Sequence, residues 1–416
     1  MVFIGLLIVV ATGYCIIKRY DARMVLFAAG LIMALISLEP LSALNAFSER
    51  MVNSGLLKPI LSVTAFAFVM KETKCDLHLI HSVVNVLKKT RSILIPASVI
   101  AVFAINIALP SAAGIGAAVG VILVPVLMAA GIQPTMAAAA VLGGTFGSML
   151  NPGLAHNPMV AEIAGVDVIE VIATHSPATI LAGLILAIGL TVIALLLKED
   201  RGYVYVIERP AEFKVSIIKA IVPVIPLAIL VLGATKIVVA LNSIDVPGAM
   251  IIGAIIGMVV TKTHPQKVVA AFYEGMGNAY TNVMSTVISA AVFVAGLTAI
   301  GLVDALINLM LNSQAIVKFA GSFGPLLLGC ISGSGDSAAF AFNEAVTPHA
   351  MDFGLNIIGL GSLAALTGAL GRTMSPVAAV TIIVSGIAGV SPIEVVKRTG
   401  PGVIVATIVA MFILAA

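Results

Sequence analysis

Long apolar runs with very few charges dominate this chain, and not one lysine or arginine occurs between Arg91 and Lys198. Of the 416 residues, 60% are hydrophobic and only 10% are charged, whereas a soluble domain carries about 25% charged residues. A water-facing surface cannot be built from so few charges, so lipid must cover most of the outside. At about 20 residues per span, the apolar runs predict an all-α polytopic membrane protein with about ten transmembrane helices.

The same composition gives little support to several other classes of protein. The formal net charge is only +3 and the basic residues lie in short loops, which does not favour nucleic-acid binding. Cys15, Cys75 and Cys330 are widely spaced, which argues against a disulfide framework or a thiolate metal site. No His-x-x-x-His or Glu-x-x-His pair is present for a metal. We therefore expect no metal and no organic cofactor.

The apolar runs divide into ten candidate spans and two interrupted stretches. The candidate spans are residues 2–17, 24–38, 57–70, 136–165, 177–197, 215–241, 248–260, 283–302, 357–390 and 401–416. The stretches 93–131 and 319–354 are interrupted by Pro110-Ser111-Ala112-Ala113-Gly114 and by Ser332-Gly333-Ser334-Gly335-Asp336. Non-helical backbone inside a membrane survives only where protein buries it or where it lines a cavity. We predict two re-entrant helical hairpins at these stretches and broken helices at 136–165 and 357–390.

The basic residues predict an orientation. With the loop 18–23 in the cytoplasm, 17 of the 22 lysines and arginines fall on that side, as the positive-inside rule requires. Beyond that loop, these residues are Lys71, Lys74, Lys88, Lys89, Arg91, Lys198, Arg201, Arg209, Lys214, Lys219, Lys262, Lys267, Lys397 and Arg398. Both termini are then predicted on the periplasmic side of a bacterial inner membrane.

An internal repeat carries the most information about function. Residues 164–177 match residues 388–401 with 7 identities in 14 positions at an offset of 224, and at 223 Ser111 pairs with Ser334. Each copy holds five spans and one hairpin, so an odd number of crossings inverts the second copy. An inverted repeat with broken helices at matching positions is typical of a secondary transporter whose site lies near the midplane. The alternative is similarity by apolar composition alone, against which the collinear Gly, Pro and Glu matches argue.

The repeat predicts the domain organisation. The first copy, 1–205, contains scaffold helices in 1–91, a hairpin and broken helix in 92–176 and a closing helix in 177–197. The second copy, 206–416, contains scaffold helices in 215–318, a hairpin and broken helix in 319–396 and a closing helix in 401–416. The polar loop 198–214 joins the two copies.

Two hairpin tips and two helix breaks are expected to converge at the centre. Glycine lets backbone approach a ligand and proline stops the helical ladder, so half-helix N-termini can offer free N–H groups to a carboxylate. The alternative is that these residues serve only packing and kinks. The candidate substrate-binding residues are Ser111, Gly144, Thr145, Asn151, Ser334, Gly335, Arg372, Thr373 and Ser375.

Deep ionisable residues add a charge pattern to this site. Arg372 is the only lysine or arginine between Lys318 and Lys397, and its guanidinium fits a carboxylate in bidentate fashion. The alternative role is a structural ion pair with Asp336. Asp336, His156 and Asn343 are the candidates for holding a coupling ion or a proton, although His156 can equally be satisfied by a neighbouring carbonyl.

Several motifs resemble those of the DcuC-type anaerobic C4-dicarboxylate carriers of the ion transporter superfamily, over nearly the whole chain. The similar segments are Leu109-Pro110-Ser111-Ala112-Ala113-Gly114-Ile115-Gly116, Ser332-Gly333-Ser334-Gly335-Asp336-Ser337-Ala338-Ala339-Phe340, Asn343-Glu344-Ala345-Val346-Thr347-Pro348-His349 and Gly371-Arg372-Thr373-Met374-Ser375-Pro376-Val377. The resemblance implies exchange or symport of succinate, fumarate, malate or related dianions, by an elevator motion in a homodimer. The hairpin tips lack the asparagine of the Ser-Asn-Thr triplets that bind sodium in related carriers. That departure favours proton coupling or plain exchange over sodium.

We therefore predict a secondary carrier of C4-dicarboxylates and not an enzyme. A carrier of the same fold for a hydroxy acid, a tricarboxylate or an amino acid is the main alternative. An anion channel would carry rings of like charge or a repeated filter, and the sequence has neither. An enzyme would need a nucleophile with its base or paired metal ligands, and the repeat gives no reason for two copies of such a scaffold.

Overall fold

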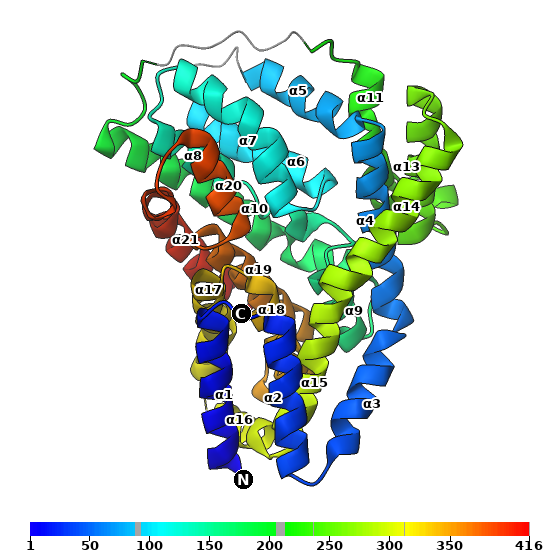
Figure 1. Ribbon diagram of the computed structural model, residues 1–416, viewed down its shortest axis with the longest axis vertical. Coiled ribbons are helices and arrows are strands. Elements are labelled where there is room, and N and C mark those ends of the chain that lie inside the picture. Colours follow the sequence, from blue (N-terminus) through cyan, green and yellow to red (C-terminus); the bar gives the residue numbers. More distant parts are fainter. Residues whose placement is uncertain (88–92, 205–212, 236, 312, 416) are drawn as a thin grey trace.

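The computed structural model describes residues 1–87, 93–204, 213–235, 237–311 and 313–415, and every regular element in these ranges is a helix (Figure 1). Lys88, Lys89, Arg91 and Arg209, which contributed to the predicted orientation, lie outside the described residues. The prediction of an all-helical protein with many apolar helices is confirmed. Among the described residues, seven helices are long and apolar enough to cross a membrane, and other apolar helices are shorter.

The helices of the first half lie between residues 2 and 197. They are α1 (Val2–Ile17), α2 (Ala22–Ile36), α3 (Pro40–Met51), α4 (Ser54–Glu72), α5 (Cys75–Leu87), α6 (Leu94–Ala108), α7 (Ala112–Ala129), α8 (Pro134–Leu142), η2 (Gly147–Leu150), α9 (His156–Ala164) and α10 (Val168–Leu197). Proline at the start of α3 and of α8 suits the first helical turn, where no backbone donor is needed.

The helices of the second half lie between residues 217 and 414. They are α11 (Ile217–Ile221), η3 (Val222–Val224), α12 (Ile225–Ala234), η4 (Val239–Leu241), α13 (Val246–Thr261), α14 (Pro265–Ala279), η5 (Tyr280–Met284), α15 (Ser285–Ala299), α16 (Leu302–Leu311), α17 (Gln314–Ser332), α18 (Gly335–Ala345), η6 (Thr347–Phe353), α19 (Ile357–Thr373), α20 (Ala379–Ala388) and α21 (Pro392–Leu414).

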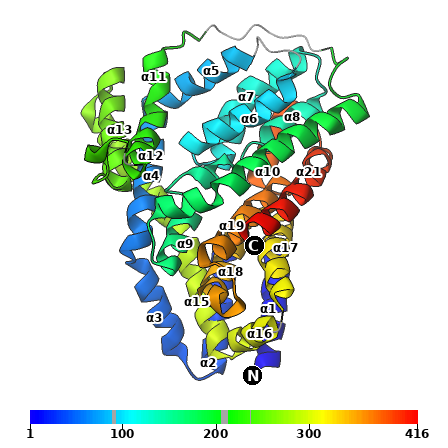
Figure 2. The ribbon, with the colours of Figure 1, turned by 180° about the vertical axis from the view of Figure 1, so that it is seen from behind.

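The buried apolar residues fall into separate cores rather than one. The largest core takes side chains from α5–α8, α10, α17 and α19–α21, so it joins elements of both halves of the chain. Smaller cores lie among α4, α12, α13 and α14, and between the pair α1–α2 and α15. Seen from behind, α10 and α21 lie side by side across the large core (Figure 2). The buried apolar side chains are therefore distributed over one large core and several smaller ones.

Two long helical segments run through the height of the molecule and cross each other, α3–α4 and α14–η5–α15 (Figure 1). α2 packs against α15 where two glycines meet: a Cβ on Gly30 would lie 2.3 Å from the Val292 carbonyl, and one on Gly296 would lie 2.2 Å from the Gly30 carbonyl. Small residues let membrane helices approach this closely. Close contact between the backbones of α2 and α15 therefore fixes how these two helices pack.

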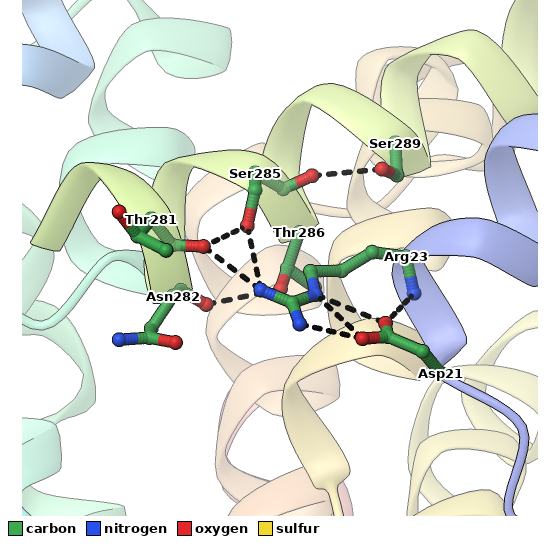
Figure 3. Close-up of polar contacts among 7 residues, drawn as sticks. All are labelled: Asp21, Arg23, Thr281, Asn282, Ser285, Thr286 and Ser289. Carbon is green, nitrogen blue, oxygen red and sulfur yellow. Dashed lines mark hydrogen bonds and ion pairs between the residues drawn. The ribbon is translucent and has the colours of Figure 1, made fainter. Parts of the chain in front are cut away.

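The segment α14–η5–α15 is continuous because a π-helical turn, η5, joins its two α-helices. At this turn Arg23, from the start of α2, donates an Nη1 hydrogen bond of 2.9 Å to the Thr281 carbonyl (Figure 3). The Ser285 hydroxyl donates to the same carbonyl. Asp21 orients the guanidinium, and the hydrogen bond from Arg23 lowers the pKa of Asp21 to about 2. A charged pair thus fastens α2 to the π-turn.

Two of the predicted boundaries differ from the structure. The span predicted at 283–302 is part of a helical segment that begins at Pro265. The span predicted at 57–70 follows a further helix, α3, which the sequence reading missed because its Ser, Asn, Glu and Arg residues lower its hydropathy. α3 carries Arg50, whose charge is compensated by carboxylates of other helices.

Candidate functional site

Two pairs of consecutive helices, α6–α7 and α17–α18, turn back on themselves. α6 and α7 are joined at residues 109–111, and Ser111 caps α7 by accepting a hydrogen bond of 3.1 Å from the Gly114 N–H. α17 and α18 are joined at residues 333–334, where Gly333 adopts a positive φ of 77°. Each connection ends in a serine that precedes a helix N-terminus, Ser111 and Ser334.

Two helices break at the level of these turns. Residues 143–155 separate α8 from α9, and 374–378 separate α19 from α20. Asn106 of α6 accepts a hydrogen bond of 2.9 Å from the Ser148 N–H, and Asn151 donates one of 2.8 Å to the Ile107 carbonyl. Side-chain amides thus satisfy backbone groups that the break exposes.

A cavity of about 300 Å³ lies where the turns and breaks meet, a size at the lower end for small-molecule sites. Its lining residues are Ile60, Thr64, Pro110, Ser111, Ala112, Ala113, Ser148, Gly153, Leu154, Ala155, His156, Val283, Gly333, Ser334, Asp336, Phe340, Arg372, Ala379 and Val380. The first turns of α7, α9, α18 and α20 all contribute. Because helix N-termini carry partial positive charge, four of them around one cavity favour an anion.

Asp336 and His156 form a hydrogen-bonded pair in the cavity. His156 Nε2 lies 3.1 Å from Asp336 Oδ1, with the histidine buried at 2% exposure and the aspartate open to the cavity at 47%. The His156 ring also packs on Phe340 at 4.3 Å between ring centroids. Its Nδ1 is buried with no hydrogen-bond partner. The imidazole is thus held by a carboxylate and an aromatic ring rather than by a neighbouring carbonyl.

Arg372 is the cation of the cavity. Its Nη2 donates a hydrogen bond of 3.1 Å to the Thr145 carbonyl, so the first helix break holds a side chain of the second. Within the described part of the chain, no carboxylate lies within 4.0 Å of the guanidinium, and Asp336 pairs with His156 instead. The Arg372 Nε is buried without a partner. A buried, unsatisfied, charged donor is costly unless a ligand completes it.

Of the predicted site residues, Ser111, His156, Ser334, Asp336 and Arg372 line the cavity. The predicted residues of the first break, Gly144, Thr145 and Asn151, lie outside the lining and hold the backbone next to it. Gly144 packs so closely that a Cβ there would lie 2.5 Å from the Val99 carbonyl. Thr145 orients Arg372 through its carbonyl while its hydroxyl donates to Leu142.

The remaining predicted residues of the second half also lie outside the lining. A Cβ on Gly335 would meet the Gly368 carbonyl, so this glycine allows α18 to contact α19. The Thr373 hydroxyl donates to the Ala369 carbonyl, and the Ser375 hydroxyl accepts from the Val377 N–H. Asn343 donates to the Gly361 carbonyl and accepts from the Thr347 hydroxyl, which uses both ends of its amide.

Sequence reasoning missed two polar residues of the lining, Thr64 and Ser148. A signal for Ser148 was present, since it precedes Arg372 by 224 residues, the offset of the repeat. Most of the lining falls into pairs separated by 223 or 224 residues. These seven pairs are Ile60 and Val283, Pro110 and Gly333, Ser111 and Ser334, Ala113 and Asp336, Ser148 and Arg372, Ala155 and Ala379, and His156 and Val380.

A multi-span helical protein with turned-back and broken helices around a polar cavity has the fold of a membrane transporter. The fold is similar to that of MtrF from Neisseria gonorrhoeae, whose structure is described as representing a class of antimetabolite efflux pumps. The two structures match with a TM-score of 0.65 and 12% sequence identity, over 92% of this chain and 85% of MtrF. The chain belongs to the DcuC family, described as the C4-dicarboxylate anaerobic carrier, whose model matches residues 2–416. It is therefore a bacterial-type, multi-pass membrane transporter and not an enzyme.

Two relatives show how closely the family is shared. An uncharacterized transporter of Haemophilus influenzae is 44% identical over 279 residues, which is 64% of this chain and all of that protein. The anaerobic C4-dicarboxylate transporter DcuC of Escherichia coli K12 is 26% identical over 435 residues, which is 98% of this chain and 94% of the relative.

Proposed function

We propose that this protein is a secondary active transporter that moves C4-dicarboxylates such as succinate, fumarate or malate across the bacterial inner membrane. It works by elevator-type alternating access, as proton- or sodium-coupled symport or as dicarboxylate exchange. The observation that carries this proposal is the buried, unpartnered Nε of Arg372 in a cavity surrounded by four helix N-termini. This arrangement supplies both a fixed cation and partial positive charges for a dianion.

In this proposal the cavity divides into an anion site and a coupling site. Arg372, Ser111, Ser334 and Ser148 offer donors to the two carboxylates, while Gly144, Thr145, Asn151, Gly335, Thr373 and Ser375 hold the backbone that presents them. Asp336 and His156 are placed to hold a proton or a coupling cation beside the substrate. Asn343 fixes α18 against α19 and contributes indirectly.

The paired lining residues support an inverted repeat with its pseudo-two-fold axis through the cavity. The element order supports it as well, since α1–α2, α3–α4, α5, α6–α7, α8–α9 and α10 correspond to α12–α13, α14–α15, α16, α17–α18, α19–α20 and α21. In the first copy the five spans are α1, α2, α3–α4, α8–α9 and α10, where each pair counts as one crossing, and α6–α7 is the re-entrant hairpin. The second copy has the same arrangement, and α5 and α16 are not counted as spans. The proposed copies are residues 1–205 and 206–416, which gives ten spans.

The separate cores support a scaffold domain and a transport domain. We define the scaffold domain as α1–α4 and α12–α15, and the transport domain as α6–α10 and α17–α21. The large core holds α6–α8, α10, α17 and α19–α21 of the transport domain together across both copies, as a body that moves as a unit requires. The scaffold is proposed to form the interface of a homodimer, with both termini on the periplasmic side.

The test is counterflow in liposomes. Purified protein in liposomes loaded with succinate is expected to accelerate the uptake of labelled external succinate. Equal uptake into protein-free liposomes would remove the proposal. Because MtrF shares the fold and is described as an efflux pump for antimetabolites, a panel of C3 to C6 mono-, di- and tricarboxylates, hydroxy acids and amino acids belongs in a thermal-shift screen. Stabilisation by mass action identifies the preferred anion.

A further inference from the structure

A second group of ionised side chains lies apart from the cavity, where α3 approaches α9 and α18. Arg50 donates from Nη1 to Glu162 Oε1 at 3.0 Å and from Nη2 to Glu344 Oε2 at 2.5 Å. Asn53, the N-cap of α4, donates to the same Glu162 oxygen at 2.6 Å. We call Arg50, Glu162 and Glu344 the Arg50 cluster. One guanidinium of the scaffold domain thus holds carboxylates of two transport-domain helices.

The Arg50 cluster is short of one positive charge. With all three groups ionised, two carboxylates face one guanidinium, so the sum is one negative charge. The Glu344 side chain is only 9% exposed, and its Oε1 is buried with no hydrogen-bond partner. An incompletely compensated buried charge is unfavourable, and a carboxylate in that position takes up a proton more readily. One bound proton makes the cluster neutral.

No other cation is available to Glu344 from the helices packed against α18. α15 carries no charged residue; α17 carries Lys318 and α19 carries Arg372, and among the described residues neither of these two forms an ion pair with Glu344. On α9, His156 pairs with Asp336, and on η6, His349 pairs with Asp352 at 3.3 Å. Among the ion pairs of the described residues, Glu344 has Arg50 alone.

Water can reach the Arg50 cluster from one side of the protein. A cavity of about 730 Å³ is lined by Glu162 together with Lys58, Asp167, Glu170 and Asp245. Glu162 is 32% exposed, so it can leave Arg50 for water at little cost, whereas Glu344 cannot. Asp167 and Glu170 lie in the connection predicted to be periplasmic. Protons from that side therefore have a route to the cluster.

We propose that Glu344 is a proton-coupling site of the carrier, and that the Arg50 cluster is the ionic latch between its scaffold and transport domains. The inference rests on the proposed transport function. A proton from the periplasm binds the Glu344 carboxylate and forms a carboxylic acid, which releases it from Arg50, and the partly exposed Glu162 then leaves Arg50 for water as both helices move with the transport domain. Glu344 can then move along the apolar contact formed by Leu56, Ile60, Val287 and Phe340. The proton leaves on the cytoplasmic side.

The experiment compares exchange with gradient-driven uptake in liposomes containing the full chain, with the membrane potential clamped. In the wild type, a pH difference of one unit, acidic outside, supports about tenfold succinate accumulation per coupled proton. Glu344→Gln, which mimics the protonated acid, is expected to keep counterflow at equal pH within about twofold and to lose the accumulation. Glu49→Gln, an exposed carboxylate beside Arg50, is the matched control and should change neither.

A pH profile separates coupling from a structural role. Arg50→Gln removes the cation that favours the ionised carboxylate, so the midpoint of pH-dependent uptake should move to higher pH, whereas Glu344→Gln should flatten the profile. An unmoved midpoint in Arg50→Gln, or gradient-driven accumulation that survives in Glu344→Gln, would overturn the latch. Wild-type counterflow without any effect of the pH difference would overturn it too. Absence of wild-type counterflow would instead overturn the proposed function.

Discussion

The chemistry of the cavity comes from three side chains, Asp336, His156 and Arg372. Asp336 pairs with His156 through Nε2, while His156 Nδ1 and Arg372 Nε are both buried without a hydrogen-bond partner. The Thr145 carbonyl holds the guanidinium in place without neutralising it. The cavity thus contains a cation that forms no ion pair with the described residues, in a position where a carboxylate can reach it.

Arg372→Lys keeps the charge but removes the planar fork and the Nε donor. We expect succinate affinity to fall about tenfold to a hundredfold, because a hydrogen bond to a charged group contributes about 1.5–3 kcal/mol. The measurement is the concentration of succinate needed to raise the melting temperature by a fixed amount, which scales with the dissociation constant. Arg398→Lys makes the same change at an ion pair with Glu199 outside the cavity and should leave affinity as in the wild type. Unchanged affinity in Arg372→Lys would refute direct contact with substrate.

The scarcity of charged residues in the apolar runs made part of the site predictable from the sequence. Arg372 and Asp336 stand out in the sequence because few charges occur in the apolar runs, and Ser334 follows from its repeat partner Ser111. All four line the cavity. The supporting parts could not be foreseen, because Thr145 acts through its carbonyl and Asn343 turns toward Gly361. Such roles depend on packing geometry, which residue type does not encode.

At the scale of elements, glycines set how closely the helices approach. A Cβ on Gly147 would lie 2.1 Å from the Phe103 carbonyl of α6, and one on Gly371 would lie 2.2 Å from the Leu326 carbonyl of α17. These contacts occupy corresponding places in the two copies, since both residue pairs are offset by 223 or 224. Gly147 in the first break and Gly371 in the last turn before the second break therefore pack closely against the first arm of each hairpin.

Gly147→Ala is expected to destabilise the protein by about 1–3 kcal/mol, because the added methyl group has a backbone oxygen in its way. Gly277→Ala is the control, since a Cβ there meets nothing within 4 Å and alanine favours the helix. Thermal denaturation in detergent, followed by fluorescence-detected size exclusion, compares the two. Equal melting temperatures would show that the contact between η2 and α6 adjusts to the added methyl group without cost.

Two elements, α3 and η5, could not be predicted from the sequence, each for its own physical reason. α3 was missed because five of its residues are polar enough to lower the hydropathy of the helix, and the contacts of Arg50 depend on α9 and α18, which lie far away in sequence. The π-turn at η5 carries no proline or glycine to announce it. By contrast, the hairpins and breaks were predictable because glycine, proline and serine mark them at matching places.

At the scale of the whole molecule, the charge distribution predicts which loops face which side. The ion pair of Arg398 with Glu199 joins two segments that both belong to the predicted cytoplasmic set, at 2.6 Å. Asp167 and Asp245 lie together around the large cavity on the other side. The packing of these two regions is compatible with the predicted orientation.

Cysteine labelling checks this orientation. In a background with Cys15, Cys75 and Cys330 replaced by serine, Ser243→Cys should react with an impermeant maleimide in intact spheroplasts. Arg201→Cys should react only after permeabilisation, because its loop belongs to the positive cytoplasmic set. Both positions are exposed, so access to the reagent is equal apart from the membrane. The reverse labelling pattern would invert the proposed topology.

The seven lining pairs show that both copies contribute residues at corresponding positions of the cavity. At only a few of these positions do the two copies differ in charge. Ala113 stands opposite Asp336, Ser148 opposite Arg372, and Val380 opposite His156. A duplicated ancestor with identical halves would have had a symmetric vestibule, and these three sites are where the copies diverged chemically. They are accordingly the first positions to randomise when redesigning such a carrier for an anion of different charge or length.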